Sequence, residues 1–171
     1  MIFPPRGFKK QLTRLALPFA WKPRHLPQRR ASRTVRLVLD TNVLIAALIT
    51  RDTPPDQLYQ AWRDGRLELA SCEQQLEEIR RVTRRLGVKL RIRPVEAGRM
   101  VNDLRALATM VGQLPTVDVS PDPYDNYLLA LAQVVQSEYL VTGDKSDLLA
   151  LKQHGRTRIV TAREAITLLS G

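Results

Sequence analysis

The chain has 171 residues and a formal net charge of +10, with 27 Lys or Arg, 17 Asp or Glu and one Cys. This length supports one domain with a substantial core, and a single cysteine excludes a disulfide framework and argues against a zinc site. The positive charge suggests a nucleic-acid partner, but nine of the basic residues and none of the acidic ones lie in residues 1–34. Residues 35–171 carry 18 basic and 17 acidic residues, a net charge of only +1.

Residues 1–34 contain five prolines, which interrupt any long helix. Their apolar run at residues 15–21 is too short to span a membrane or to serve as a secretory signal, and no other segment is a transmembrane candidate. We expect a disordered extension before one domain of residues 35–171. This extension is either a basic arm that could touch nucleic acid or a stretch upstream of the true start. We expect a cytoplasmic protein with no membrane partner.

Short apolar runs alternate with segments of helical periodicity along residues 35–171. An apolar run followed by a helical pattern indicates a buried parallel strand that enters a helix. The alternation predicts a three-layer α/β domain around a parallel sheet with right-handed crossovers. We expect strands at residues 35–40, 66–70, 116–119, 139–142 and 157–160. We expect helices at residues 42–49, 55–64, 72–86, 94–111, 123–136, 145–153 and 162–169.

Acidic residues lie where these strands end and the following helices begin. Helix capping explains each of them separately, because Asp is a favoured N-cap. The carboxyl ends of parallel strands meet at one edge of a sheet, so several such residues together indicate a shared site. The acidic residues at these junctions are Asp40, Asp122, Asp125 and Asp144.

Two further acidic residues, Glu77 and Glu78, lie inside the helix expected at residues 72–86. We expect Ser71 to begin this helix, with Gln74 completing a capping-box pattern. Capping does not explain a glutamate at this depth in a helix, which favours a functional site. Adjacent helical residues point about 100° apart, so only one of the two glutamates can face it. A second capping box, formed by Thr161 and Glu164, begins the helix at residues 162–169.

Four blocks of the sequence resemble the PIN-domain nucleases, and within them the bacterial toxins of toxin–antitoxin pairs. One block alone, such as Asp-Thr-Asn, is common, whereas four blocks in the family's order are a specific signal. The resemblance spans residues 35–169, which is nearly all of the chain after its N-terminal segment. The matching blocks are residues 38–45, 77–79, 122–132 and 139–144.

The resemblance implies a five-stranded parallel sheet of order 3-2-1-4-5 with an acidic site. The family's Glu directly precedes an aliphatic residue, which favours Glu78 over Glu77, and spacing to the apolar stripe favours Asp125 over Asp122. Asn126 stands where the family often has a second Asp, and one extra residue after Lys145 leaves open a role for Asp147. The implied metal-binding and catalytic residues are Asp40, Glu78, Asp125 and Asp144, with Asn42 and Thr142 orienting ligands or waters.

The resemblance also implies a Mg²⁺- or Mn²⁺-dependent endoribonuclease, restrained by a small antitoxin and forming a homodimer. Clustered carboxylates repel one another, and a hard divalent cation relieves that repulsion. Two alternatives remain: a non-catalytic PIN-like module that binds RNA or a protein, and a haloacid-dehalogenase-like phosphatase. The phosphatase needs a second Asp two residues after the first, where this chain has Asn42.

Basic residues cluster directly after the two glutamates. Arg81 and Arg85 share one face of the expected helix, and Arg80 and Arg84 share the adjacent face. Such a charge run is often a solvated surface, but a basic rim beside an acidic metal site suits an RNA backbone. We interpret these four arginines as candidate RNA contacts.

Overall fold

The computed structural model describes residues 34–144 and 146–171. Our expectation of a disordered extension therefore concerns a segment that lies, apart from Thr34, outside the described residues. Within the described residues, no helix is long and apolar enough to cross a lipid bilayer.

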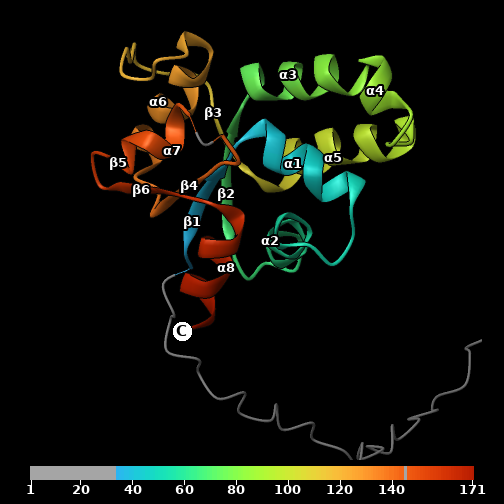
Figure 1. The fold of residues 1–171 in the computed structure, drawn as a ribbon, viewed down its shortest axis with the longest axis horizontal. Helices are drawn as coiled ribbons and strands as arrows, with labels where there is room; N and C mark the ends of the chain where they lie inside the picture. The colour runs from blue at the N-terminus through green and yellow to red at the C-terminus, as the bar shows by residue number, and fades with distance from the viewer. Residues whose placement is uncertain (1–33, 145) are drawn as a thin grey trace, which may run out of the picture. The chain divides into compact units, whose positions relative to one another are not determined.

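One sheet runs through the domain in the order β3-β2-β1-β4-β6-β5 (Figure 1). All neighbouring strands pair in parallel except β5, which pairs with β6 in antiparallel fashion. The first five positions confirm the predicted order 3-2-1-4-5, because β6 is the strand that was expected fifth, at residues 157–160. The two-residue β5 adds an edge strand that was not predicted. The strands are β1 (Arg36–Leu39), β2 (Glu68–Cys72), β3 (Thr109–Val111), β4 (Tyr139–Val141), β5 (Gln153–His154) and β6 (Thr157–Val160).

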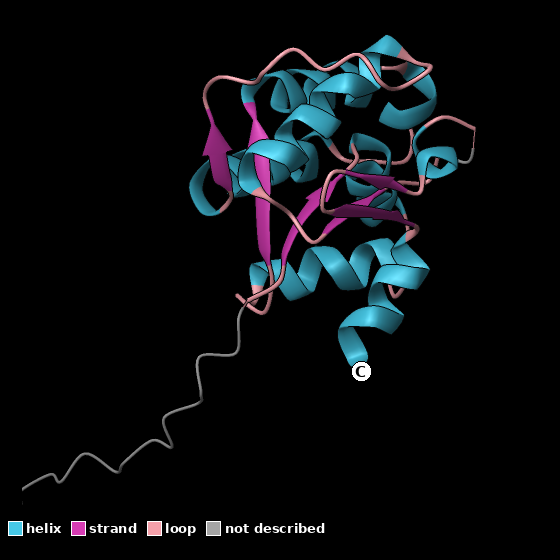
Figure 2. Cartoon of the chain, turned by 90° about the vertical axis from the view of Figure 1, so that its left-hand side faces the viewer, coloured by secondary structure: helices cyan, strands magenta, loops and turns pink. Residues whose placement is uncertain are grey.

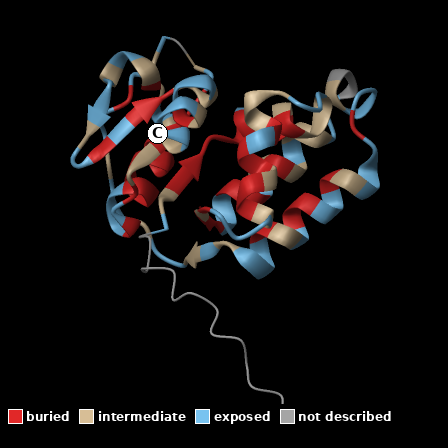
Figure 3. Cartoon of the chain, turned by 90° about the horizontal axis from the view of Figure 1, so that it is seen from below, coloured by how far each residue is buried: buried red, intermediate tan, exposed pale blue. Residues whose placement is uncertain are grey.

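Helices cover both faces of the sheet, which confirms the predicted three-layer α/β architecture (Figure 2). Successive strand side chains point to opposite faces, so Leu37 and Leu39 enter one core while Val38 enters the other. Buried residues follow the strands and the helix surfaces that face them (Figure 3). The helices are α1 (Thr41–Ile49), α2 (Pro54–Arg63), α3 (Glu73–Thr83), α4 (Leu86–Lys89), α5 (Pro94–Leu107), α6 (Asn126–Val135), α7 (Leu148–Leu151) and α8 (Ala162–Ser170), with a 3₁₀ turn, η1 (Pro123–Asp125), before α6.

The third strand was predicted in the wrong place. Strand β3 follows α5 directly and pairs with the end of β2, whereas residues 116–119 form no strand. The backbone N–H of Val119 instead donates to Asn126 Oδ1 at 3.0 Å, and the N–H of Ser120 donates to the same oxygen at 2.8 Å. These backbone N–H groups therefore bond to the first residue of α6 and not to a neighbouring strand.

Three predicted helices were too long. The segment 72–86 ends as α3 at Thr83, whose hydroxyl bonds back to the Ile79 carbonyl, and a separate short α4 follows. The segment 94–111 is helical only to Leu107, because its last three residues form β3. The segment 145–153, whose first residue lies outside the described part, is helical only in α7, because Lys152 adopts a left-handed φ of 59° and β5 follows.

The two predicted capping boxes had different outcomes. Thr161 and Glu164 form theirs at the start of α8, with Thr161 Oγ1 accepting from the Glu164 N–H at 3.2 Å. The box at Ser71 is wrong, because Cys72 occupies the N-cap position of α3 without a side-chain cap. Ser71 is the last but one residue of β2, and its hydroxyl donates to Gln75 Oε1 at 2.7 Å.

Candidate metal centre

The candidate site lies at the carboxyl ends of β1 and β4, where the chain changes from one face of the sheet to the other. The helices after β1 and β2 pack on one core, whereas α6, which leads into β4, packs on the other. In open α/β sheets this switch point is where ligands bind. The Asp40 N–H donates to the Val141 carbonyl at 2.9 Å, which joins the two strand ends.

Asp40 is the most deeply buried acidic residue of the predicted set, with 5% of its surface exposed. Burial raises the pKa of its carboxyl, and the charges of Glu78 and Asp144 raise it further. Two hydrogen bonds act in the opposite direction: Thr142 Oγ1 donates to Oδ2 at 2.6 Å, and the Asn42 N–H donates to Oδ1 at 3.2 Å. These donors are neutral, so they orient Asp40 but leave its charge uncompensated.

Thr142 connects two of the predicted acidic residues. It is fully buried, and its hydroxyl donates to Asp40 while accepting the backbone N–H of Asp144 at 3.1 Å. The Asp144 carboxylate accepts the backbone N–H and the hydroxyl of Ser146, which helps to lower the pKa of Asp144 despite the opposing effect of burial. Asn42 is exposed, and its contact with Asp40 uses the backbone N–H rather than the side chain.

Of the two glutamates on α3, Glu78 lies at the site and Glu77 is exposed. Thr41 Oγ1 donates to Glu78 Oε2 at 2.8 Å, and the Tyr127 hydroxyl donates to the same oxygen at 2.6 Å. Sequence reasoning missed Thr41 and Tyr127. Thr41 lies inside the Asp-Thr-Asn block, and its position next to Asp40 could have marked it as a site residue. Tyr127 is 49 residues from Glu78 in the sequence, and only the fold brings the two together.

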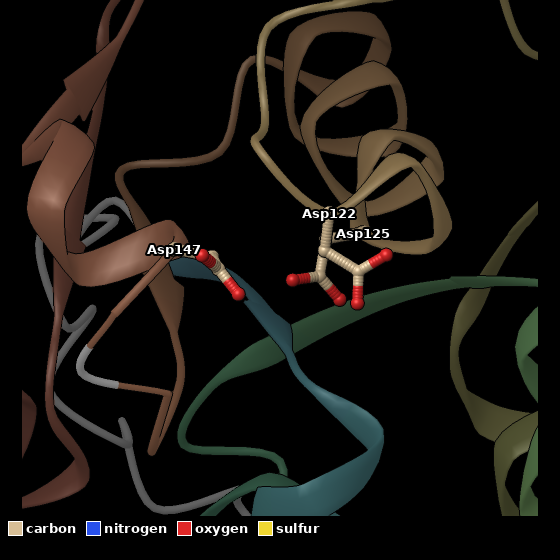
Figure 4. A group of neighbouring side chains, drawn as sticks. All are labelled: Asp122, Asp125 and Asp147. Atoms are coloured by element: carbon tan, nitrogen blue, oxygen red, sulfur yellow. The ribbon is translucent and has the colours of Figure 1, made fainter.

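Asp122, Asp125 and Asp147 approach one another most closely, with one oxygen of each within 4.8 Å of the others. Their carboxylates converge from the loop before α6 and the turn before α7 (Figure 4). Burial, followed by the charges of Asp40, Asp122, Asp144 and Asp147, raises the pKa of Asp125 to about 7. Asp122 is also held locally, because it accepts the Tyr124 N–H at 2.9 Å.

Among the described residues, only Asp122, Asp125 and Asp147 have carboxylate oxygens within 4.8 Å of one another, whereas the other predicted acidic residues influence Asp40 and Asp125 through their charges. The charges of Glu78 and Asp144 act on Asp40, and those of Asp40 and Asp144 act on Asp125. Asn126 does not take the place of a second acidic ligand, since its Oδ1 is bound to the two backbone N–H groups before η1. The metal-binding and catalytic roles of these residues stay predictions.

The donor set fits a hard divalent cation. It consists of carboxylate oxygens, and no arginine, lysine or histidine in the described part of the chain pairs with Asp40 or Asp125. A buried carboxylate is costly without a compensating partner, and Mg²⁺ takes few protein carboxylates together with waters and phosphate oxygens. Asp40, Glu78, Asp125 and Asp144 could hold such an ion, with Asp122 and Asp147 within reach of Asp125.

The arginines of α3 divide between two surroundings, as their helical spacing predicts. Arg81 NH2 lies 3.7 Å from Glu78 Oε1, at the edge of the acidic site. Arg80 and Arg84 instead line a separate pocket toward α5. Arg85 is exposed. Their role in RNA binding stays a prediction.

A comparison with known families relates the chain to the PIN domain. The sequence profile of the PIN domain family matches residues 36–146, which contain every acidic residue assigned above except the alternative Asp147. No individual curated protein matches the chain.

Proposed function

The chain belongs to the PIN domain family, and we propose that it is a metal-dependent endoribonuclease. PIN domains are generally metal-dependent nucleases, so a nuclease-type hydrolase is the coarse assignment that family membership supplies. The observation that carries the finer proposal is the buried Asp40, which lies near further carboxylates and, among the residues that the structure describes, accepts side-chain hydrogen bonds from neutral donors alone. Membership of the PIN family favours this nuclease over the haloacid-dehalogenase-like phosphatase.

Asp40, Glu78, Asp125 and Asp144 would hold Mg²⁺ or Mn²⁺ in this proposal. A bound divalent cation polarises the phosphoryl oxygen of the substrate and lowers the pKa of an attacking water. The protein's contribution is to fix the carboxylates in advance. Thr142 holds Asp40, and Thr41 and Tyr127 hold Glu78, so the ligand oxygens need little reorganisation when substrate arrives.

Cleavage of RNA by the purified full-length chain tests this function. Wild type is compared with Asp40→Asn and Glu78→Gln, in Mg²⁺ or Mn²⁺ and in EDTA, on single-stranded RNA and on DNA of the same sequence. Either substitution should lower cleavage by more than about a hundredfold, since even neighbours of metal ligands contribute ten- to hundredfold.

Glu77→Gln is the matched control, because Glu77 is exposed on the same helix and differs from Glu78 by one position. It should cleave as wild type does. Cleavage that persists in EDTA would contradict the metal dependence. A wild-type chain that binds RNA but never cuts it would favour the non-catalytic PIN-like module instead.

We further propose that this nuclease is the toxin of a toxin–antitoxin pair, acts as a homodimer and is restrained by a small antitoxin. The support is the resemblance of its four sequence blocks to such toxins. The acidic site also suits capture by a basic side chain, because a cation can neutralise clustered carboxylates. Arg81, at 3.7 Å from Glu78, is an example within the chain of a guanidinium that approaches this site.

A further inference from the structure

A pocket lies beside α3, on the side that faces α5. It has a volume of about 420 Å³. Helix α5 runs alongside α3, and α4 connects them at one end (Figure 1). Its size is within the usual range for sites that hold one small ligand, roughly 300–1,000 Å³. We call it the α3–α5 pocket.

The α3–α5 pocket combines an apolar floor with a cationic rim. Ile92 and Val101 line it and are 3% and 5% exposed, so they form its deep surface. Arg84 and Lys89 line it and are exposed, and the amide of Asn102 adds a polar group. A ligand that matches this surface carries a negative charge beside a flat or apolar body.

The basic residues of the rim differ in whether they form ion pairs within the protein. Arg80 NH1 lies 3.4 Å from Glu73 Oε1, an oxygen that Arg105 also binds at 2.6 Å. Arg84 and Lys89, by contrast, have no ion-pair partner among the residues that the structure describes. Their positive charge is therefore available to an anion from outside the protein.

Gly98 keeps one wall of the pocket open. It lies in the interior of α5, where glycine costs roughly 0.5–1 kcal/mol relative to alanine. Its φ is not in the left-handed region, and a Cβ added there would meet no heavy atom within 4 Å. Neither backbone conformation nor close packing requires glycine at this position. Gly98 is exposed and lines the pocket, so a longer side chain at this position would lie at the edge of the pocket.

Helix α3 links this pocket to the acidic site. Arg84 follows Glu78 by six residues, which is roughly 9 Å along the helix axis. Arg81 lies between them and reaches toward Glu78. Because Arg84 also lies about 120° around the helix from Glu78, a single strand with one phosphate at the carboxylates would pass over Arg81 and around α3 to reach the pocket.

We propose that the α3–α5 pocket binds one nucleotide of the single-stranded RNA that is cut at the acidic site. Arg84 and Lys89 hold its phosphate, the base lies against Ile92 and Val101, and the amide of Asn102 meets the base edge. This inference rests on the proposed ribonuclease function and adds a place where the substrate strand is held away from the scissile bond.

Substitution of Gly98 by leucine tests the proposal, because the side chain would occupy the pocket without straining the helix. The affinity of the full-length chain for a short fluorescent single-stranded RNA is measured in Mg²⁺, in the Asp40→Asn background that prevents cleavage. Gly98→Leu should weaken binding by about tenfold or more. Its unfolding temperature should equal or exceed that of the parent, because leucine is a better helix former than glycine.

Ala106→Leu is the matched control, since Ala106 is an exposed residue of α5 that does not line the pocket. It should bind RNA as the parent does. Arg84→Gln supplies an independent variant: loss of one phosphate contact should flatten the dependence of log affinity on log salt by about 0.7. Equal affinity of Gly98→Leu and Ala106→Leu, together with an unchanged salt slope for Arg84→Gln, would overturn the proposal.

The two proposals fail in different ways. If the chain with an intact site cleaves RNA and the Gly98 and Arg84 variants bind it normally, only the pocket assignment is wrong. If the intact chain neither binds nor cleaves RNA, both assignments are wrong. RNA binding that depends on Gly98 and Arg84 without any cleavage would support the pocket and contradict the nuclease function.

Discussion

At the scale of single residues, the candidate centre is held in place by neutral hydrogen-bond donors. Hydroxyl groups of Thr142, Thr41 and Tyr127 donate to the carboxylates of Asp40 and Glu78. Hydroxyl donors fix the orientation of a carboxylate and leave its negative charge in place. Such an arrangement selects for a cation that comes from solution, since an arginine in these positions would have neutralised the site permanently.

Asp125 should make the folding stability of the metal-free protein depend on pH. Its pKa is raised from 3.8 to about 7 in the folded chain, so the metal-free protein is most stable when this carboxyl is protonated. The contribution is fully present below pH 3.8 and is lost as the pH rises through about 7. We therefore expect Asp125→Asn to gain stability over wild type between pH 5 and pH 8 in EDTA. Solvent screening should keep the gain to about 1 kcal/mol.

Urea unfolding of both proteins in EDTA at the two pH values measures this gain. Asp64→Asn serves as the control, because Asp64 is an exposed residue in the turn after α2 and pairs with Arg66. Its stability difference from wild type should be the same at pH 5 and pH 8. A difference for Asp125→Asn that is equally independent of pH would contradict the raised pKa.

At the scale of elements, one buried side chain fixes α3 against the end of β1. Gln75 is 1% exposed, and its Nε2 donates to the Leu39 carbonyl at 2.6 Å. Ser71 Oγ donates to its Oε1 at 2.7 Å. Leu39 directly precedes Asp40, and Gln75 precedes Glu78 by about one helical turn. This pair of hydrogen bonds therefore sets the distance between two predicted metal ligands.

Gln75→Leu should lower the free energy of unfolding by about 1–3 kcal/mol, because it removes one hydrogen bond from a buried carbonyl and one from a buried hydroxyl. It should also reduce the extra stability gained on adding Mg²⁺, since α3, which carries Glu78, is no longer fixed against the strand that precedes Asp40. Chemical unfolding with and without Mg²⁺ measures both effects. Gln74→Leu is the control on the exposed neighbouring position and should change neither by more than about 0.5 kcal/mol. Equal effects of the two substitutions would contradict this role.

The sequence predicted those elements whose residues are buried on both sides. Strands β1 and β4 are almost entirely apolar, and β2 and β6 each contain a buried apolar pair, Leu69-Ala70 and Ile159-Val160, because a central parallel strand packs against helices on both faces. Strand β3 lies at one edge of the sheet with only three residues, none of them buried, and such a strand leaves a weak pattern. Its true position follows from pairing with β2, which periodicity cannot show.

At the site, too, the sequence predicted the residues that local patterns mark and missed those that only the fold brings together. The acidic residues were visible because strand ends and helix starts converge at one sheet edge. Thr41 and Tyr127 were not predicted, because they lie 37 and 49 residues away from Glu78 in the sequence. The close approach of Asp147 to Asp122 and Asp125 likewise depends on how the turn before α7 folds back.

At the scale of the whole molecule, positive charge is unevenly distributed. Residues 35–171 carry a net charge of only +1, so the folded domain has no general attraction for RNA. Its basic residues on α3 lie next to the acidic site and the α3–α5 pocket instead. We expect affinity for RNA to depend on these local contacts, so that the surface around α3 selects the substrate.

The proposed toxin role predicts an effect on living cells. Induced expression of the full-length chain in bacteria should arrest growth, because an active endoribonuclease depletes cellular RNA. Asp40→Asn should relieve the arrest while the protein accumulates to the same level, since the substitution removes a predicted metal ligand and keeps the shape of the side chain. Glu77→Gln, at the exposed position beside Glu78, should arrest growth as wild type does. Growth curves and protein levels measured together separate toxicity from poor expression. Normal growth of cells that contain soluble chain with ribonuclease activity would leave the enzyme assignment intact and contradict the toxin, because an unrestrained toxin cannot be both active and harmless.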